Sequence, residues 1–284
     1  MTAGPQPSGT NRLVLAPTTL PEAEPLDFLA AAEAAGYDGV GLRLARSPGL
    51  SYRPVLGNAA LIREMKRRIA DSGLEVVDIL SFYLQPDTDV AAFAPAIELG
   101  AEFGGRYILV MGADGDWGRM VGNFARLRDL AAASGLRCML EAAVMRPLAS
   151  LAQCVRLIEE SGCRDAGICI DPLNFLRAGD TPDAMRRLDP ALFPYAQISD
   201  GLLGPGEPDP SLLGRMGPNQ RRMMGEGVVP VAAILDALPP GLPLSVELPD
   251  PSGRALADPD WARIALRSTR DFLARYHARQ GAGA

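Results

Sequence analysis

Short runs of apolar and β-branched residues alternate along the chain with longer segments whose apolar positions recur at helical spacing. The runs predict strands at residues 12–16, 39–44, 75–81, 107–111, 136–141, 167–171, 194–200 and 243–247. The segments that follow them predict helices at residues 25–35, 58–72, 90–99, 118–133, 148–160, 182–188, 229–238 and 259–279. Strands that alternate with helices indicate parallel βαβ units, and a count of eight favours closure into a (β/α)8 TIM barrel.

A doubly wound open sheet is the alternative α/β architecture. Such a sheet normally carries a phosphate-binding loop, yet neither G-x-G-x-x-G nor G-x-x-x-x-G-K-[ST] occurs in the sequence, so no nucleotide cofactor is expected. The length of 284 residues suits a single barrel domain, which we place at residues 12–280. Residues 1–11 are rich in Gly, Pro, Ser and Thr and are expected to form a disordered tail rather than a signal peptide.

The composition argues against two kinds of partner. The formal net charge is −6 and basic residues occur only in short groups, which disfavours a nucleic-acid surface. No stretch approaches the roughly 20 apolar residues of a membrane span, so we expect no membrane partner and a cytoplasmic location. The cysteines form no C-x-x-C pair and are expected to be reduced core thiols: Cys138, Cys154, Cys163 and Cys169.

Four polar side chains stand at or near the C-terminal ends of four consecutive predicted strands: Glu141, Asp171, Gln197 and Glu247. Side chains alternate between the two faces of a strand, so if these four point to the barrel axis, their neighbours Leu140, Ile170, Ile198 and Val246 face the helices. The same alternation directs Met139, Cys169, Tyr195 and Ser245 to the axis. Catalytic groups of TIM barrels lie at this end of the strands.

The remaining composition narrows the chemistry at that end. The one histidine, His277, lies in the closing helix, and the one lysine, Lys66, lies on the second helix, so a Ser-His-Asp triad, a Cys-His pair and a strand-borne Schiff-base lysine are not expected. Carboxylates that converge repel one another unless a cation lies between them. The four polar side chains therefore predict one divalent metal ion per chain. The alternative is that these four groups only form hydrogen bonds at the end of the barrel and bind no metal.

These residues carry a resemblance to the sugar phosphate isomerase/epimerase superfamily with a xylose isomerase-like barrel, over nearly all of the chain after residue 11. The matching segments are Leu140-Glu141 (strand-five ligand), Asp171-Pro172-Leu173-Asn174 (strand-six motif), Gln197-Ile198-Ser199-Asp200 (where many members have H-x-K-D), Val246-Glu247 (strand-eight ligand) and 222–228 (a Gly-Glu-Gly segment). The resemblance implies a divalent metal held by the four strand-end side chains.

The chain departs from that family pattern at two positions. Gln197 stands in place of the usual histidine, and its neutral amide oxygen favours Mn or Mg over Zn. Asn174 stands where many members have a second histidine, so a proton transfer assigned to that histidine is absent or moved. The trinuclear-zinc endonucleases of the superfamily need several histidines, which disfavours DNA repair as a function.

The function implied is that of a metal-dependent epimerase or isomerase acting on a small keto sugar, polyol or sugar acid. A metal chelated by a hydroxyketone acidifies the C–H between its oxygens and stabilises the enediolate. By resemblance, Glu141 and Glu247 would approach opposite faces of the substrate, one as base and the other as acid. A lyase on the same site, such as a keto-polyol dehydratase or a 3-keto-glycoside eliminase, and a non-catalytic metabolite-binding barrel remain open. The sequence also leaves open whether the chain forms a homodimer or a homotetramer.

Six further side chains are candidates for contacts with a carbohydrate or polyol substrate: Arg43, Tyr83, Trp117, Arg146, Asn174 and Arg222. The arginines offer a planar fork of donors, and the two aromatic residues, in predicted loops after strands three and four, could stack on a sugar ring. Surface ion pairs and ordinary loop packing are the alternatives. The long Gly/Pro-rich loop 201–227 is either a lid or a subunit contact, and the sequence does not choose.

Overall fold

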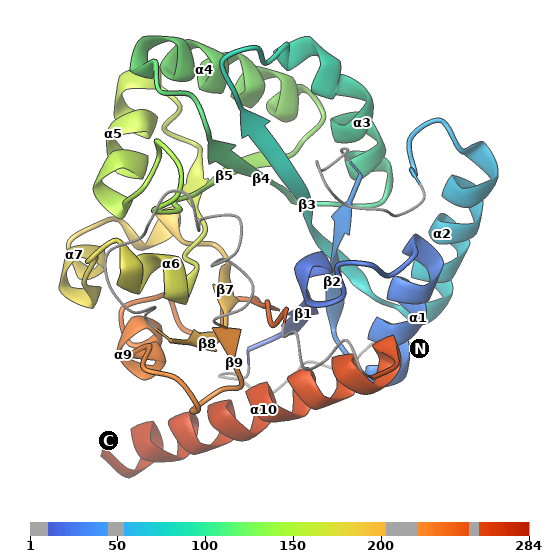
Figure 1. The fold of residues 1–284 in the computed structure, drawn as a ribbon, viewed down its shortest axis with the longest axis vertical. Helices are drawn as coiled ribbons and strands as arrows, with labels where there is room; N and C mark the ends of the chain where they lie inside the picture. Colours follow the sequence, from blue (N-terminus) through green and yellow to red (C-terminus); the bar gives the residue numbers. More distant parts are fainter. Residues whose placement is uncertain (1–10, 45–53, 203–220, 250–255, 284) are drawn as a thin grey trace.

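The computed structural model describes residues 11–44, 54–202, 221–249 and 256–283. Within these residues, eight parallel strands form one curled sheet in the order β6-β5-β4-β3-β2-β1-β10-β7 (Figure 1). They are β1 (Leu13–Leu15), β2 (Gly39–Arg43), β3 (Glu75–Leu84), β4 (Tyr107–Gly112), β5 (Arg137–Glu141), β6 (Gly167–Ile168), β7 (Ala196–Ile198) and β10 (Leu244–Val246). The two ends of the sheet meet where the backbone N–H of Gln197 donates to the O of Ile170 at 3.0 Å. The predicted TIM barrel is confirmed.

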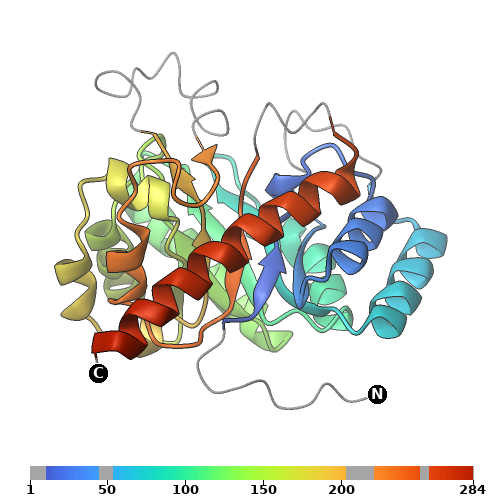
Figure 2. The same cartoon turned by 90° about the horizontal axis from the view of Figure 1, so that it is seen from below.

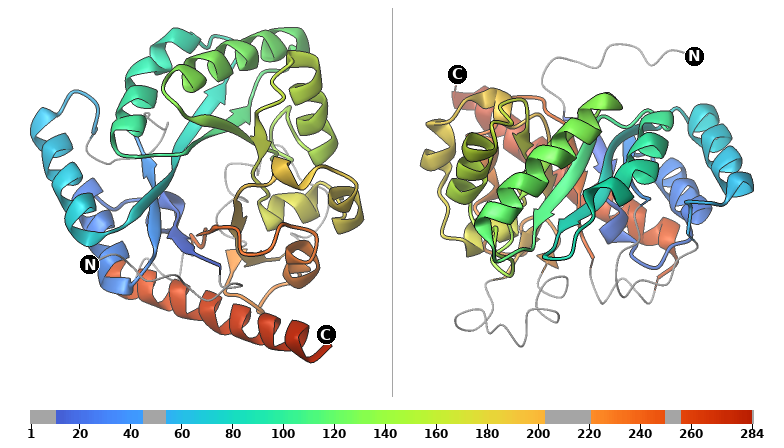
Figure 3. Two further views of the ribbon diagram at one scale, coloured as in Figure 1. Left: turned by 180° about the vertical axis from the view of Figure 1, so that it is seen from behind. Right: turned by 90° about the horizontal axis from the view of Figure 1, so that it is seen from above.

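Helices surround the strands, as the views from in front and behind show (Figures 1 and 3). The helices are α1 (Pro25–Ala35), α2 (Ala59–Ser72), α3 (Ala94–Glu102), α4 (Trp117–Ala133), α5 (Leu151–Ser161), α6 (Pro172–Arg177), α7 (Pro182–Arg186), α9 (Val231–Leu235) and α10 (Asp258–Gly283). Short 3-10 turns cover Pro17–Thr19, Val90–Phe93 and Pro190–Leu192. In the described part of the chain, no helix is both long and apolar enough to cross a membrane.

Most predicted helices are present, with differences at their ends. The predicted helix 90–99 is divided into a 3-10 turn and α3, which has Pro95 in its first turn, where a missing N–H is tolerated. The short helix α6, directly after β6, was not predicted. Of the expected tail, residues 1–10 lie outside the described residues, while the amide of Asn11 donates to the O of Leu242 at 2.9 Å.

The interior of the barrel is filled by one small apolar cluster: Val14, Val77, Leu80, Leu109, Met139, Cys169 and Tyr195. The alternate residues Leu140, Ile170, Ile198 and Val246 belong to the larger core between strands and helices. This agrees with the assignment of faces made from the sequence. All four cysteines are buried and free, as expected.

A β-bulge in β3 brings a carboxyl group into this interior. The register with β2 shifts by one residue after Val40, so that Gly41 lies opposite Asp78. The extra residue turns both Val77 and Asp78 inward, where the hydroxyl of Tyr195 donates to Oδ2 of Asp78 at 3.0 Å. Glycine at position 41 leaves room for this carboxyl group, because a Cβ there would lie 2.4 Å from Oδ1 of Asp78.

Candidate functional site

The four predicted strand-end side chains lie side by side on consecutive strands around the closing seam of the barrel. Glu141, Asp171, Gln197 and Glu247 keep only 6%, 2%, 4% and 8% of their surface exposed. Backbone hydrogen bonds join the strands at this level: Cys169 N–H to Leu140 O (2.8 Å), Gln197 N–H to Ile170 O (3.0 Å) and Glu247 N–H to Ile198 O (3.1 Å). Polar side chains so deeply buried need partners, because desolvation is costly.

Asp171 has a local structural role that explains the Asp-Pro motif. It is the N-cap of α6, and its Oδ1 accepts the backbone N–H of Asn174 at 2.7 Å, while Pro172 opens the helix. The amide of Asn174 in turn donates to Oε1 of Glu141 at 3.3 Å. The cap fixes Asp171 so that its other oxygen, Oδ2, is directed to the rest of the site.

An arginine that was not a candidate occupies the centre of the arrangement. Arg221 lies on β9 (Arg221–Arg222), which pairs antiparallel with β8 (Asp200–Gly201) at the end of the barrel toward which the strands run (Figure 2). Its Nη2 is 2.7 Å from Oδ2 of Asp171 and 3.3 Å from Oε1 of Glu247. Its Nη1 donates to the hydroxyl of Ser199 at 2.6 Å. The guanidinium of Arg221 is therefore a cation that both Asp171 and Glu247 contact.

The charges in the site are unequal. Burial, and after it the negative charges of Glu247 and Asp171, raises the pKa of Glu141 well above its ordinary value. Burial also raises the pKa of Glu247, with a partial offset from Arg221. Burial would lower the pKa of Arg221, but the carboxylates outweigh it and raise that pKa instead. Three carboxylates against one guanidinium leave two negative charges when all are ionised, which one divalent cation would balance.

The donor atoms suit an oxygen-preferring cation. Among the described residues, Oε1 of Gln197 and Oε2 of Glu247 are buried without a hydrogen-bond partner, and Oδ2 of Asp171 has only its ion pair with Arg221. Carboxylate and amide oxygens are the ligands that Mn and Mg prefer. Within the described part of the chain, no three His, Cys, Asp or Glu side chains are already arranged to hold a metal ion. The ligand types fit a metal, while their present arrangement centres on Arg221.

A model of the xylose isomerase-like TIM barrel family matches residues 29–272, which cover most of the chain. The chain belongs to this family. No curated protein sequence matches it.

Solved structures of similar fold cover almost the whole chain. The IOLI protein with a bound zinc atom is 16% identical, with a TM-score of 0.76 over 93% of this chain and 99% of that one. An L-ribulose 3-epimerase is 19% identical, with a TM-score of 0.70 over 97% and 98%. The probable 3-DHS dehydratase AsbF from Bacillus anthracis is 15% identical, with a TM-score of 0.68 over 89% and 98%. At these identities the likeness shows the shared xylose isomerase-like fold.

The Gly-Glu-Gly segment at residues 225–227 has a clear structural basis in this barrel. Oδ2 of Asp200 accepts the backbone N–H groups of Gly225 (3.0 Å) and Gly227 (2.9 Å), and Oδ1 accepts those of Gly201 (2.7 Å) and Val229 (3.1 Å). Asp200 thus fastens the end of the loop that carries Arg221. Residues 203–220 of the predicted loop 201–227 lie outside the described residues.

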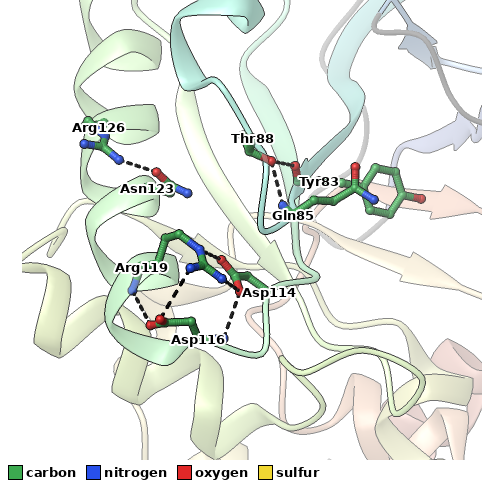
Figure 4. Close-up of polar contacts among 8 residues, drawn as sticks. All are labelled: Tyr83, Gln85, Thr88, Asp114, Asp116, Arg119, Asn123 and Arg126. Carbon is green, nitrogen blue, oxygen red and sulfur yellow. Dashed lines mark hydrogen bonds and ion pairs between the residues drawn. The ribbon is translucent and has the colours of Figure 1, made fainter.

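Two substrate candidates come together on the Glu141 side of the site. The hydroxyl of Thr88 donates to the backbone O of Tyr83 and accepts the N–H of Gln85, which holds the end of β3 in place (Figure 4). The guanidinium of Arg146 lies 5.2 Å from the centre of the Tyr83 ring. Burial, and after it the charge of Glu141, raises the pKa of Tyr83. Tyr83 and Arg146 therefore border the carboxylates.

Trp117 is placed differently from the other candidates. It is the first residue of α4 rather than a loop residue. The turn that precedes it in the sequence is held by the ion pair of Asp114 with Arg119 (Figure 4). The indole Nε1 of Trp117 donates to Glu160 of α5 at 2.6 Å, and Arg156 stacks on the ring at 4.4 Å. The indole joins two outer helices, and this position gives no support to a contact with substrate.

The two remaining candidates are arginines at the edge of the site. Nη1 of Arg222 donates to the backbone O of Arg221 at 2.9 Å, and Nη1 of Arg43 donates to the O of Pro21 at 3.2 Å. The charge of Arg43 is close enough to Glu247 to lower the pKa of that carboxyl slightly against the effect of burial. Asn174, already described, contacts Glu141 directly.

Arg221 and Asp78 were missed at the sequence level for different reasons. Arg221 stands beside the chosen Arg222, and only the pairing of β9 with β8 decides which of the two reaches the carboxylates. Strict alternation along β3 puts Asp78 on the same face as Val76, whereas the bulge turns it inward. An acidic residue in the middle of an apolar run was the available signal for Asp78.

Proposed function

We propose that this chain is a divalent-metal-dependent epimerase or isomerase of a small keto sugar, polyol or sugar acid. The observation that supports it most is the pair of buried carboxyl groups, Glu141 and Glu247, on the outer two of the four strands that meet at the seam. Both have raised pKa values, as a group that exchanges protons near neutral pH requires. The two polar side chains between them, Asp171 and Gln197, complete a ligand set for Mn or Mg.

The surroundings of the two glutamates suggest different roles. Glu247 contacts the guanidinium of Arg221, which favours its ionised form, so Glu247 is the better base. Glu141 accepts a hydrogen bond from the amide of Asn174, and burial, together with the charges of Glu247 and Asp171, favours its protonated form, so it is the better acid. A metal held by Glu141, Asp171, Gln197 and Glu247 would act as a Lewis acid toward the carbonyl of the substrate. Glu247 would take the proton next to that carbonyl, and Glu141 would return one.

The test is exchange of a substrate C–H with solvent deuterium. The protein is incubated in D2O with saturating Mn and a panel of ketoses, inososes and keto acids, and the hydrogen next to each carbonyl is followed by proton NMR. We expect Mn-dependent loss of one such signal, and no loss with the Glu247→Gln variant. Absence of exchange across the whole panel would refute the proposal.

A lyase that uses the same site is the second candidate. Its first step is the same removal of a proton by a carboxylate, and it differs only if a hydroxyl β to the carbanion then leaves. Appearance of an enone absorbance, with no epimer or isomer recovered, would assign the site to a dehydratase or eliminase. Tight binding of a sugar that remains unchanged after long incubation would assign the barrel to metabolite binding without catalysis.

A further inference from the structure

Both carboxylate oxygens of Asp171 are already engaged. Oδ1 accepts the N–H of Asn174 as the cap of α6, and Oδ2 lies 2.7 Å from Nη2 of Arg221. A metal that used Asp171 as a ligand would need one of these oxygens. The cap is fixed by the backbone of a helix, whereas the contact with Arg221 depends on a side chain that can rotate. Oδ2 is therefore the oxygen that can change partner.

The other predicted ligands keep oxygens that Arg221 does not use. Oε1 of Gln197 and Oε2 of Glu247 have no hydrogen-bond partner among the described residues, and Glu141 accepts only the long bond from Asn174. A metal that used these three oxygens would take none of the atoms that contact Arg221. Only a bond from the metal to Oδ2 of Asp171 would place the ion at an atom that already contacts the guanidinium of Arg221. The two cations would repel each other there.

We propose that Arg221 and a divalent metal ion compete for Oδ2 of Asp171, so that the guanidinium leaves this oxygen when the metal binds. The inference rests on the metal site of the proposed function. Arg221 need not leave the site altogether, because it is also held by Ser199 at 2.6 Å and by Oε1 of Glu247 at 3.3 Å. Its backbone is fixed by the pairing of β9 with β8, so the change is a rotation of the side chain.

The competition has a consequence for the metal-free protein. Arg221 supplies a positive charge to Asp171 and Glu247 in the absence of metal, so these buried carboxylates are partly compensated and we expect the barrel to fold without metal. Metal binding must then break a charge-assisted contact, which lowers the affinity for the ion. Removal of the guanidinium should raise that affinity.

The experiment is a titration of the full chain with Mn²⁺ alone, in which free Mn²⁺ is measured by electron paramagnetic resonance. Wild type is compared with Arg221→Met and with Arg177→Met as the matched control. The charge of Arg177, a half-buried residue, also acts on Asp171, so Arg177→Met removes a nearby positive charge while the ion pair of Arg221 with Asp171 stays in place. Arg221→Lys keeps the charge but has no fork to span Ser199 and Asp171, and it serves if Arg221→Met does not fold.

We expect Arg221→Met to bind Mn²⁺ about 10-fold to 100-fold more tightly than wild type, because a hydrogen bond to a charged group contributes on that scale. Arg177→Met should gain less than about threefold, and Arg221→Lys should fall between wild type and Arg221→Met. Unchanged or weaker binding by Arg221→Met, or an equal gain in Arg177→Met, would overturn the competition while leaving the metal site intact. No binding by any variant at millimolar Mn²⁺ would overturn the metal site itself and the competition with it.

Discussion

Oδ2 of Asp200 accepts the backbone N–H of Gly227 at 2.9 Å, and the two residues are so close that a Cβ at position 227 would lie 2.2 Å from the other carboxylate oxygen. Only glycine fits this approach. The same carboxylate accepts the backbone N–H groups of Gly201, which precedes Arg221 in the sequence, and of Gly225 and Val229, which follow it. The Asp of the strand-seven motif and the second Gly of the Gly-Glu-Gly segment form a single structural unit.

Loss of this carboxylate should destabilise the protein strongly. In Asp200→Ala, four backbone N–H groups lose their acceptor, and we expect the free energy of unfolding to fall by about 2–4 kcal/mol. Asp189→Ala is a suitable control, because Asp189 is exposed and accepts one backbone N–H at the start of a 3-10 turn. Its cost should be about 1 kcal/mol. Urea unfolding followed by circular dichroism measures both, and equal costs would refute the role of Asp200.

The buried carboxyl of Asp78 should make stability depend on pH. Burial raises the pKa of Asp78 from 3.8 to about 7. Between these values the folded protein keeps a proton that the unfolded chain has lost, so this group's contribution to stability decreases as pH rises from about 4 to about 7. Asp78→Asn can still accept from Tyr195 and cannot ionise.

We therefore expect Asp78→Asn to gain stability relative to wild type as the pH is raised from 5 to 8, by about 2–3 kcal/mol at 1.36 kcal/mol per pKa unit. Urea unfolding at the two pH values gives the difference. Wild type and variant with parallel pH dependences would show that Asp78 is ionised in the folded protein.

The two glutamates should be needed for proton exchange but not for folding. Glu141→Gln and Glu247→Gln each replace a carboxyl group by an amide of similar shape that cannot act as an acid or a base. Each substitution should slow deuterium exchange of the substrate by at least about 100-fold. Glu226→Gln is the control, because Glu226 is exposed in the Gly-Glu-Gly segment. Retention of wild-type exchange by either Glu141→Gln or Glu247→Gln would remove that residue from the proposed chemistry.

The two aromatic candidates should behave differently on substitution. Tyr83 borders Glu141 and Arg146, so Tyr83→Ala should raise KM for the substrate by about 10-fold, on the scale of a lost aromatic contact. Trp117 is bonded to Glu160 on the outer helices, so Trp117→Phe should change KM by less than about twofold. Steady-state kinetics distinguish the two, and a larger effect at Trp117 would contradict the assignment.

The strands and helices of the barrel could be predicted because the spacing of apolar residues along each element indicates directly which of its faces is buried. The placement of Leu140, Ile170 and Val246 toward the helices follows from that pattern alone. The environment of the site could not be predicted in the same way. A one-residue bulge brings in Asp78, and a pairing between Asp200 and Arg222 brings in the neighbouring Arg221. Both depend on contacts between distant segments, which local patterns do not encode.

Equilibrium dialysis against Mn²⁺, with bound metal measured by mass spectrometry, tests the central claim most directly when wild type is compared with Gln197→Leu. This substitution removes an unpartnered amide oxygen from the seam without changing the charge of the site or leaving a cavity. We predict about one Mn per chain in wild type, with affinity at least about 10-fold weaker in the variant, since oxygen ligands set the affinity for such ions. No bound Mn in wild type, or equal binding by the two proteins, would contradict a metal site formed by these four strand ends.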